Sequence, residues 1–555
     1  MLDTELVLKQ GGELFGKRSQ LLSLWQNIAD NFYPERADFT TVRNLGAEFA
    51  TNLMSSYPII ARRDLGNSFG SMLRPTSKQW QHIRTKNNWD TLSVSARAWL
   101  EDADTRMTRA MYARPSQFTR ATKEADHDFA AFGQAVLQIS LNSTATGILY
   151  KTWHLRDVAW AESPDGNINT VYRKWKATAI ALKTLFPNTI HRSTVELAAK
   201  NPYTEIEVWH CVMETSAYNG DKKWRTKYVS LYLDVENNHI LEEVGVHEFG
   251  YVIPRWQTVS GSQYAYSPAT VAALPDARLI QAMTRVLLEA GEKATTPPMI
   301  AVQEAIRSDI SVYAGGITWV DSAYDERLGE VLRPITQDLR GIPNGMEMAK
   351  SVHAMIAEAF FLNKLALPQP GNDMTAYEVG QRVQEYIRQA MPLFEPMENE
   401  YNAPLCETTF SIMLRSGGFG SVFDIPRELQ GQGFEFEFES PLHDAVEREK
   451  GQRFLEAQSM LAQAVQLDPS AAYLVDVGIA LRDVLNGIGV PAKWTRSQSD
   501  MDKAQAQAAQ KQQTAELLAN MQTGANINKT LADAQTAGTI RRTNINDNAT
   551  PASSI

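Results

Sequence analysis

The chain has 555 residues, 43% of them apolar and 21% charged, and its 64 acidic against 54 basic side chains give a formal net charge of −10. This ordinary globular composition supplies enough chain for several domains, and its acidic balance argues against a protein that grips nucleic acid by neutralising phosphates, though not against one that lets nucleic acid slide past. The two cysteines, Cys211 and Cys406, exclude a disulfide framework and a cysteine-based zinc site, and they favour a reducing compartment.

The first half of the chain is predicted to mix helices with antiparallel strands. Helical spacing predicts a first helix from about Thr4 to Asn31, which Pro34 ends. Further helices are expected over 63–73, 99–112 and 117–132, with strands over 79–84 and 135–141. From Gly147 to Pro254, short aromatic and β-branched runs alternate with turn sequences, and one helix, 178–186, interrupts them. This order is typical of an α+β body.

Two long helices bracket a small mixed segment in the middle of the chain. Ser267 and Pro268 form a typical helix start, and this helix should reach about Ala294 with a kink or restart at Pro275. Its apolar stripe is Leu279, Met283, Val286, Leu287 and Ala290. A second helix begins at a capping box, 344–347, and should run to about Leu367. The strand-like segment between them, 299–334, suggests the head of a two-helix stalk.

The last third begins with a break in regular structure at 367–373, LPQPGND. A helix starting near 375 should be interrupted by Pro392, Pro396 and Pro404 and resume to Leu414. The run FEFEFES, 434–440, alternates with a period of two and predicts a half-buried strand. Helices are expected over 444–466 and 471–486. No aromatic residue follows Trp494, and the end of the chain reads as a disordered or partner-dependent tail.

Membrane and metal sites are not expected. The sequence begins without the order of a signal peptide, and its most apolar helical stretch, 354–367, is interrupted by Glu358 and Lys364. None of the nine histidines has a metal-ligand spacing, and the glycine clusters do not match a nucleotide-binding loop. We therefore expect no cofactor and no metal.

Two groups of residues resemble catalytic patterns. The GxSxG match at 66–70, around Ser68, lacks the strand of a nucleophile elbow, so we interpret it as a helix whose glycines allow close packing. Asp126 and Asp128 form one acidic group, which we interpret as a solvated or inter-subunit face. A second acidic group is the ladder Glu435, Glu437 and Glu439, which we interpret as a solvated strand face. We expect no enzyme and no catalytic residues; a nuclease or hydrolase built on these groups is the remote alternative.

Six passages occur in a characteristic order along the chain. They are Arg18 with LLSLWQNIADNFYPE, then DLGNSFGSMLRPTSKQW, PSQFTRATKEADHDFAAFGQAVL, YAYSPATVAALPDARLIQ, PQPGND with MTAYEVGQRVQE, and EFEFESPLHDAVEREKG. Together they resemble the portal (head-to-tail connector) proteins of short-tailed bacteriophages, over about Gly12 to Val490. One departure is Ala265, where that family commonly has glycine.

The resemblance implies an α+β portal-protein fold assembled as a ring of twelve subunits around an axial channel. The implied parts are a wing (1–266 and 375–440), a two-helix stem (267–297 and 335–366), a clip (298–334), a channel loop (367–374), a helical crown (441–494) and a C-terminal helix with a flexible tail (495–555). Around a dodecamer the net charge would be −120, twelve times −10.

The resemblance also implies a function and partners. The ring would occupy one capsid vertex of the virion, after assembly in the host cytoplasm, and would pass double-stranded DNA without sequence specificity during packaging and ejection. It would bind the terminase large subunit and then the tail adaptor, as well as major capsid and scaffolding proteins, with internal core or ejection proteins possible at the crown. A coat or tail-tube subunit is the alternative from another class.

Two sets of site residues follow from this resemblance. The channel loop contains no base, which suits a channel that must not retain DNA. We expect Lys364 to form a ring of positive charge near the constriction, lined by Gln369, Asn372 and Asp373; an ordinary stem-surface or inter-subunit lysine is an equal alternative. In the clip, a polar docking rim for terminase and adaptor would consist of Asp325, Glu326, Arg327, Glu330 and Arg333, with a merely solvated loop as the alternative.

Overall fold

The computed structural model describes residues 4–44, 46, 48, 50–76, 79–86, 92–142, 144–218, 224–301, 332–334, 341–365, 397–438 and 457–463, together with 306, 310, 319, 321, 327, 478, 481, 507, 510, 511 and 513–515. The chain divides into two compact units. The first comprises 1–84, 101–424 and 434–488, and the second comprises 85–100, 425–433 and 489–555. Nearly all the elements below belong to the first unit.

The first predicted helix is in fact two helices, α1 (Thr4–Lys17) and α2 (Ser19–Phe32), because the chain breaks at Arg18. The Arg18 side chain is buried and its guanidinium donates to the backbone carbonyls of Leu155, Arg156 and Val158, the last at 2.7 Å. A long-range contact of this kind leaves no trace in the local helical pattern. The prediction of one continuous helix was therefore wrong.

Three further helices follow, α3 (Tyr57–Leu73), α4 (Val94–Met111) and α5 (Phe118–Phe132). Short 3-10 turns at Pro34–Arg36 and Arg114–Ser116 connect them. Helices α3 and α5 pack against each other, and the apolar residues of α5 at spacings of three and four are buried: Phe118, Ala121, Ala125, Phe129 and Phe132. Strand β1 (Gln81–Thr85) lies between α3 and α4, close to its predicted position.

The β-rich region forms two antiparallel sheets. The smaller has the order β3-β2-β9, from β2 (Val136–Leu141), β3 (Ile148–Trp153) and β9 (Tyr251–Val252). The larger runs β4-β5-β6-β7-β8 in chain order. Its strands are β4 (Val158–Glu162), β5 (Ile168–Thr178), β6 (Glu205–Glu214), β7 (Tyr228–Asp234) and β8 (His239–Val246). The predicted strands are confirmed, while the short β4 and β9 were not predicted.

Two helices accompany the larger sheet. The predicted helix at 178–186 is α6 (Ala179–Leu185), with Thr178 as its N-cap, and α7 (Arg192–Lys200) was not predicted. One core on this sheet joins Val7 and Leu14 of α1 to strand residues such as Tyr172, Trp209 and Leu231. The amphipathic helix α1 therefore covers part of the sheet, which explains why its apolar residues recur at helical spacing.

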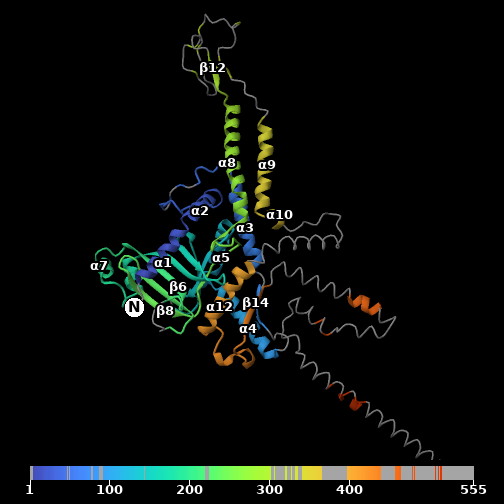
Figure 1. The fold of residues 1–555 in the computed structure, drawn as a ribbon. Coiled ribbons are helices and arrows are strands. Elements are labelled where there is room, and N and C mark those ends of the chain that lie inside the picture. Colours follow the sequence, from blue (N-terminus) through green and yellow to red (C-terminus); the bar gives the residue numbers. More distant parts are fainter. Residues whose placement is uncertain are drawn as a thin grey trace, which may run out of the picture. The chain divides into compact units, whose positions relative to one another are not determined.

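A two-helix stem occupies the middle of the chain. It consists of α8 (Pro268–Thr295) and α9 (Gly341–Ala359), which lie side by side, followed by α10 (Leu362–Leu365) (Figure 1). The segment that connects the two helices in the sequence contains strands β12 (Met299–Ala301) and β13 (Leu332–Pro334), which pair antiparallel. Helix α8 does not restart at Pro275. Pro275 and Val271 both lie on an exposed face, so the carbonyl that loses its N–H partner lies where water can reach it.

Segments after the stem pack against segments before it. A short π-helix (Glu398–Asn402) leads into α12 (Ala403–Arg415), which confirms the predicted resumption of a helix, since Pro404 lies in its first turn, where no donor is needed. Strand β14 (Phe434–Phe438) pairs with β1. Tyr150 on β3 is bonded to Thr409 on α12 at 2.8 Å. The sequence on both sides of the stem therefore builds one body.

The described part of the second unit is small. It contains the beginning of α4 and a 3-10 turn, Arg427–Leu429. Within it, the Lys86 N–H donates to the Gly433 carbonyl at 3.2 Å and the Ser93 N–H donates to Glu428 at 3.2 Å.

Candidate functional site

The base of the stem is fixed to the end of α5. Ser267 caps α8 by accepting from the Thr270 N–H, and its hydroxyl donates to the Ala130 carbonyl at 2.8 Å. The Thr270 hydroxyl donates to the Ala131 carbonyl at 2.7 Å. Gly133 has a φ of +73°, and a methyl group there would overlap the Tyr266 backbone. The end of α5 and the start of α8, which lie 137 residues apart in the sequence at Ala130 and Ser267, therefore meet in one close backbone contact. The sequence alone did not predict this contact.

A second anchor joins the middle of α8 to the start of α3. Gln281 accepts from the backbone N–H groups of Met54 and Ser55, at 2.6 and 2.8 Å, and its amide donates back to the Ser55 carbonyl at 2.9 Å. On the other stem helix, the His353 ring stacks on Tyr57 with 4.2 Å between ring centroids. Both stem helices are thus held by the segment that leads into α3.

The two stem helices pack closely where α9 begins. Gly345 lies against Leu287 of α8, and a methyl group on this glycine would approach the Leu287 Cδ2 atom to 2.8 Å. Helix α9 begins at Gly341, three residues before the predicted capping box. It ends at Ala359, because Phe361 adopts a left-handed φ of +57° while the buried Phe360 packs on Phe32. The prediction of an unbroken helix to Leu367 was therefore wrong.

Two residues of the predicted apolar stripe of α8, Leu279 and Val286, are exposed in the single chain, and the other three, Met283, Leu287 and Ala290, are partly buried. The buried residues of this helix are Ala269, Thr270, Ala273, Ala277 and Ile280, all near its base. Farther along, Leu279 is 46% exposed, Val286 63% and Leu288 54%. On α9, Met346, Met348 and Met355 are also exposed. Spacings of eight and seven residues put Val271, Leu279 and Val286 on one face. This face, defined by those three residues, is called the stem apolar face below.

The predicted channel residues fall at the edge of the described chain. Lys364 lies on α10, in the last described turn before 366, and its side chain lies outside the described residues. Gln369, Asn372 and Asp373 lie outside them as well. The charged ring at a constriction stays a prediction.

The predicted clip rim is described only in part. Arg327 is exposed and takes part in an interaction, and Arg333 is paired with Ile300 in the ladder of β12 and β13. Asp325, Glu326 and Glu330 lie outside the described residues. The docking rim therefore also stays a prediction.

Ser68 is part of a helix and not of a nucleophile elbow. It lies inside α3, where its hydroxyl donates to the Asp64 carbonyl one turn back at 2.8 Å. Gly66 faces α5 so closely that a methyl group would overlap the His127 ring, and one on Gly70 would lie 3.4 Å from an Asp126 oxygen. The prediction that these glycines permit close helix packing is confirmed.

Asp126 and Asp128 are buried ion-pair partners, so their interpretation as a solvated or inter-subunit face was wrong. Asp126 accepts from Arg74, and both side chains are at most 4% exposed. Asp128, 1% exposed, accepts two bonds from Arg36 at 2.8 and 3.0 Å. Burial acts to lower the pKa of Arg74, but Asp126 raises it above its usual value. The arginines come from distant segments, which the local sequence could not reveal.

His127 completes this network as a neutral acceptor. Its Nδ1 atom lies 3.1 Å from Nη1 of Arg62, which can only donate. Burial, followed by the nearby Arg62 charge, lowers the pKa of His127 to about 4. A ring held neutral by a donor at Nδ1 does not serve as a base for Ser68.

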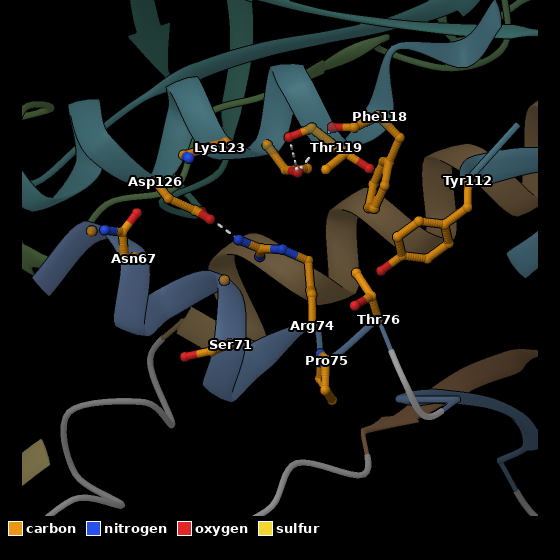
Figure 2. Close-up of a pocket in the computed structure, with 13 residues that line it drawn as sticks. Asn67, Ser71, Arg74, Pro75, Thr76, Tyr112, Phe118, Thr119, Lys123 and Asp126 are labelled. Atoms are coloured by element: carbon orange, nitrogen blue, oxygen red, sulfur yellow. Dashed lines mark hydrogen bonds and ion pairs between the residues drawn. The ribbon is translucent and has the colours of Figure 1, made fainter. Parts of the chain in front are cut away.

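A cavity of about 430 Å³ opens beside the Arg74–Asp126 pair, between α3 and α5 (Figure 2). Arg74 and Asp126 point toward each other at one side of it, with Asn67 and Ser71 from α3 and Thr119 and Lys123 from α5 around them (Figure 2). Tyr112 accepts from the indole N–H of Trp80 at 3.1 Å. The carboxylate is already neutralised by its arginine, and the described lining residues include no pairing of a nucleophile with a free base.

The acidic ladder behaves as a solvated strand face. Glu435 and Glu437 are exposed and alternate with the buried Phe436, and Glu437 pairs with Arg84 at 2.8 Å. Glu439 lies outside the described residues. Across the part of the chain that the structure describes, no group of three His, Cys, Asp or Glu residues is arranged to hold a metal ion. In the same part, no helix combines the length and apolarity needed to span a membrane.

Comparison with known proteins gives one consistent family. The family model described as "Bacteriophage head to tail connecting protein" matches residues 6–495. The chain is 26% identical over 454 residues to the "Probable portal protein" of Bordetella phage BPP-1, covering 80% of each chain. It is 23% identical over 548 residues to the "Portal protein" of Salmonella phage epsilon15, covering 96% of each.

Similarity to solved structures is much weaker. A chain from the virion of a native gene transfer agent particle matches with a TM-score of 0.34 and 9% identity, over 73% of this chain and 86% of that one. Similarity at this level carries no argument. The family match, in contrast, extends through the α+β body, the stem and α12. On that evidence, the chain belongs to the family of bacteriophage head-to-tail connecting proteins.

Proposed function

We propose that this chain is the portal protein of a bacteriophage, assembled as a dodecameric ring at one capsid vertex of the virion. The ring conducts double-stranded DNA during packaging and ejection and joins head to tail, and it does so without catalysis. Family membership supports the head-to-tail role. The observation that carries the assembly is the stem, in which two long paired helices expose apolar side chains that the single chain leaves uncovered.

The exposed stem residues are suited to contacts between subunits. In a ring, each subunit uses two different surfaces, so an apolar face on one subunit is covered by another face of its neighbour. Covering a valine or leucine side chain stabilises an interface by about 1.5–3 kcal/mol. Helix α8 has 28 residues, which at about 1.5 Å per residue gives a rod of roughly 42 Å. Rods of this length, repeated around an axis, would wall a channel.

The stem apolar face supplies a direct test of assembly. Val286→Glu places a charge where the single chain is already 63% exposed, so the fold of the subunit should persist while the ring dissociates. The matched control is Leu185→Glu on α6, where the leucine is 56% exposed. Analytical ultracentrifugation should show rings for the control and small species for Val286→Glu. Rings of equal stability in both variants would refute this role of the stem.

Passage of DNA requires a channel that does not retain it. Each phosphate that a protein neutralises releases counterions and adds affinity, so a basic lining would act as a brake. A net charge of −10 on each subunit, or −120 on twelve, opposes such binding. We place Lys364 near the constriction as a single positive ring, with Gln369, Asn372 and Asp373 lining the loop.

The role of Lys364 is tested in assembled particles. Lys364→Ala should alter packaging or DNA retention, whereas Lys350→Ala, which removes an exposed lysine of α9, should change neither. Unchanged behaviour of the Lys364 variant would make it an ordinary surface or inter-subunit lysine.

The clip is proposed as the docking rim for the terminase large subunit and then for the tail adaptor, through Asp325, Glu326, Arg327, Glu330 and Arg333. Reversing the charges of Arg327 and Arg333 should abolish capture of terminase, and a peptide spanning 298–334 should compete with the intact protein. Failure of both experiments would place the contact elsewhere. Major capsid and scaffolding proteins, and core or ejection proteins at the crown, are the other partners we propose.

A further inference from the structure

A row of polar side chains crosses three strands of the larger sheet. In the ladders, Arg173 on β5 is paired with His210 on β6, and His210 is paired with Tyr232 on β7. The His210 ring stacks on Tyr232, with 4.3 Å between centroids. Tyr251, on β9 of the smaller sheet, reaches this row and contacts both Arg173 and His210. The row therefore lies where the two sheets face each other.

Arg173 is a buried cation without a carboxylate partner among the described residues. It is 3% exposed, and its Nη1 atom has no hydrogen-bond partner within the described chain. Its guanidinium lies over the Trp153 ring at 3.8 Å, and the Lys151 ammonium lies over the same ring at 4.0 Å. Cation–π contacts compensate only part of the cost of burying a charge. The row is therefore positively polarised.

The donors and acceptors of the row can be assigned from Arg173. Arg173 can only donate, so the Tyr251 oxygen accepts from its Nε at 3.0 Å. Burial raises the pKa of Tyr251, which keeps its proton, and we assign the Nδ1 atom of His210, 2.6 Å away, as the acceptor of that proton. Burial, followed by the Arg173 charge, holds the pKa of His210 well below its usual value, so the ring is neutral. Its Nε2–H then donates to Ser230 at 2.9 Å.

This assignment of the hydrogen bonds leaves one donor, the Ser230 hydroxyl, free to bind a ligand. With His210 assigned as the Nε2–H tautomer, the Ser230 oxygen accepts from the ring, and its hydroxyl hydrogen is left to donate to a ligand in the cavity described next. The same assignment rules out a nucleophile, because His210 donates to Ser230 and does not take its proton. Ser230 is therefore a hydrogen-bond donor backed by a buried positive charge, which is a feature of a binding site for an acceptor group.

A cavity of about 440 Å³ lies over this donor. Ser230, His210 and Tyr251 line it together with a mainly apolar wall, which includes Ile139, Val212, Val246, Phe249 and Ile412. One acid, Glu248, also lines it, but this carboxylate accepts from Ser411 and lies 3.6 Å from Arg415. The volume is in the range of small-molecule sites, and the lining combines this apolar wall with polar side chains, which also include His247 and Arg415.

We propose that this cavity binds a small organic anion, namely a carboxylate on a compact aryl or alkyl body. The carboxylate accepts from Ser230 in the field of Arg173, and the body packs against the apolar wall. This site lies in the sheet region of the body, beside α12, and its lining includes no residue of α8 or α9.

The test uses three probes that share one body and differ in their end group: 3-phenylpropionate, 3-phenylpropanol and 3-phenylpropylamine. Each is titrated at millimolar concentration into the purified full-length protein and followed by calorimetry and ligand-observed NMR. The carboxylate should bind at least about tenfold more tightly than the amine. Hexanoate and 3-cyclohexylpropionate extend the series to other bodies. Equal binding of amine and carboxylate, or no binding of any carboxylate, would overturn the proposal.

Three variants locate the binding. Ser230→Ala should weaken carboxylate binding about tenfold, as expected for one lost hydrogen bond to a charged group. Ile412→Trp should abolish it by filling the cavity. Leu414→Trp is the matched control, because Leu414 is similarly half-buried on α12 and does not line the cavity. Circular dichroism should confirm that each variant folds. Carboxylate binding unchanged in both Ser230→Ala and Ile412→Trp would show that the anion binds elsewhere and would contradict the assignment.

Discussion

The buried pair Arg74–Asp126 gives a prediction whose size follows from the structure. Both side chains are almost fully buried, and Arg74 also donates to Asn402 at 2.8 Å and lies over the Tyr401 ring. At an effective dielectric constant of about 20, two charges about 4 Å apart attract by roughly 4 kcal/mol. Removing one partner leaves the other charge buried, so Arg74→Met and Asp126→Leu should each lower the free energy of unfolding by about 3–5 kcal/mol.

The double variant is expected to recover most of this loss. With both charges replaced by apolar side chains, the main remaining cost is the Asn402 oxygen that loses its donor, about 1–3 kcal/mol. The two single effects should therefore be non-additive by at least about 3 kcal/mol.

Urea unfolding of the four proteins, followed by tryptophan fluorescence, measures this coupling. The exposed pair Arg120–Glu124 is the matched control, because its coupling should stay below about 1 kcal/mol. Additive effects of Arg74→Met and Asp126→Leu would refute the ion pair as a stabilising unit. Single variants as stable as the parent, but impaired in function, would revive a functional role for Asp126.

Two further predictions concern the same region and the base of the stem. Since the folded pKa of His127, about 4, lies below its unfolded value of 6.5, its contribution to stability is full above pH 6.5 and is lost as the pH falls toward 4. Because His127 is partly exposed, this loss of stability should be about 1–2 kcal/mol. Urea unfolding of the parent and of His127→Gln at pH 7 and at pH 4.5 measures it. Identical pH profiles of the two proteins would contradict the prediction. Gly133→Ala should lower the free energy of unfolding by at least about 3 kcal/mol, because the added methyl group meets the Tyr266 backbone. The control is Gly261→Ala, at φ +87° with open space around it, which should cost only about 1 kcal/mol of backbone strain. Equal shifts of the melting temperature in the two variants would refute this contact.

Local periodicity predicted the elements well where packing follows one face. Helix α5 was predicted because its apolar residues recur at helical spacing, and strands β5 to β8 were predicted because they are aromatic and β-branched runs between turn sequences. Ser267 was readable as an N-cap because a cap is a local hydrogen bond.

The errors share a different cause, which is long-range contact. Arg18 breaks the first helix in favour of carbonyls more than 130 residues away. Asp126 and Asp128 are buried because Arg74 and Arg36 reach them from other segments. The short strand β4 is held by its neighbour β5 and carries little pattern of its own. For the stem, periodicity indicated an apolar stripe but could not show which of its residues pack on α9, as Leu287 does, and which stay exposed in the single chain, as Leu279 and Val286 do.

The candidate sites divide in the same way. The rejection of Ser68 as a nucleophile was possible from the sequence, because a nucleophile elbow needs a strand before the turn. The hydrogen-bonded row that ends at Ser230 could not be predicted from the sequence. Arg173, His210 and Tyr251 come from three strands, and only the fold sets the register that brings them together.

Assembly into a ring is the central claim, and negative-stain imaging of the purified full-length protein tests it most directly. We expect closed rings with a central hole, whose class averages show twelve subunits. Monomers, flat sheets or continuous tubes under the same conditions would contradict the portal ring and favour a coat or tail-tube subunit.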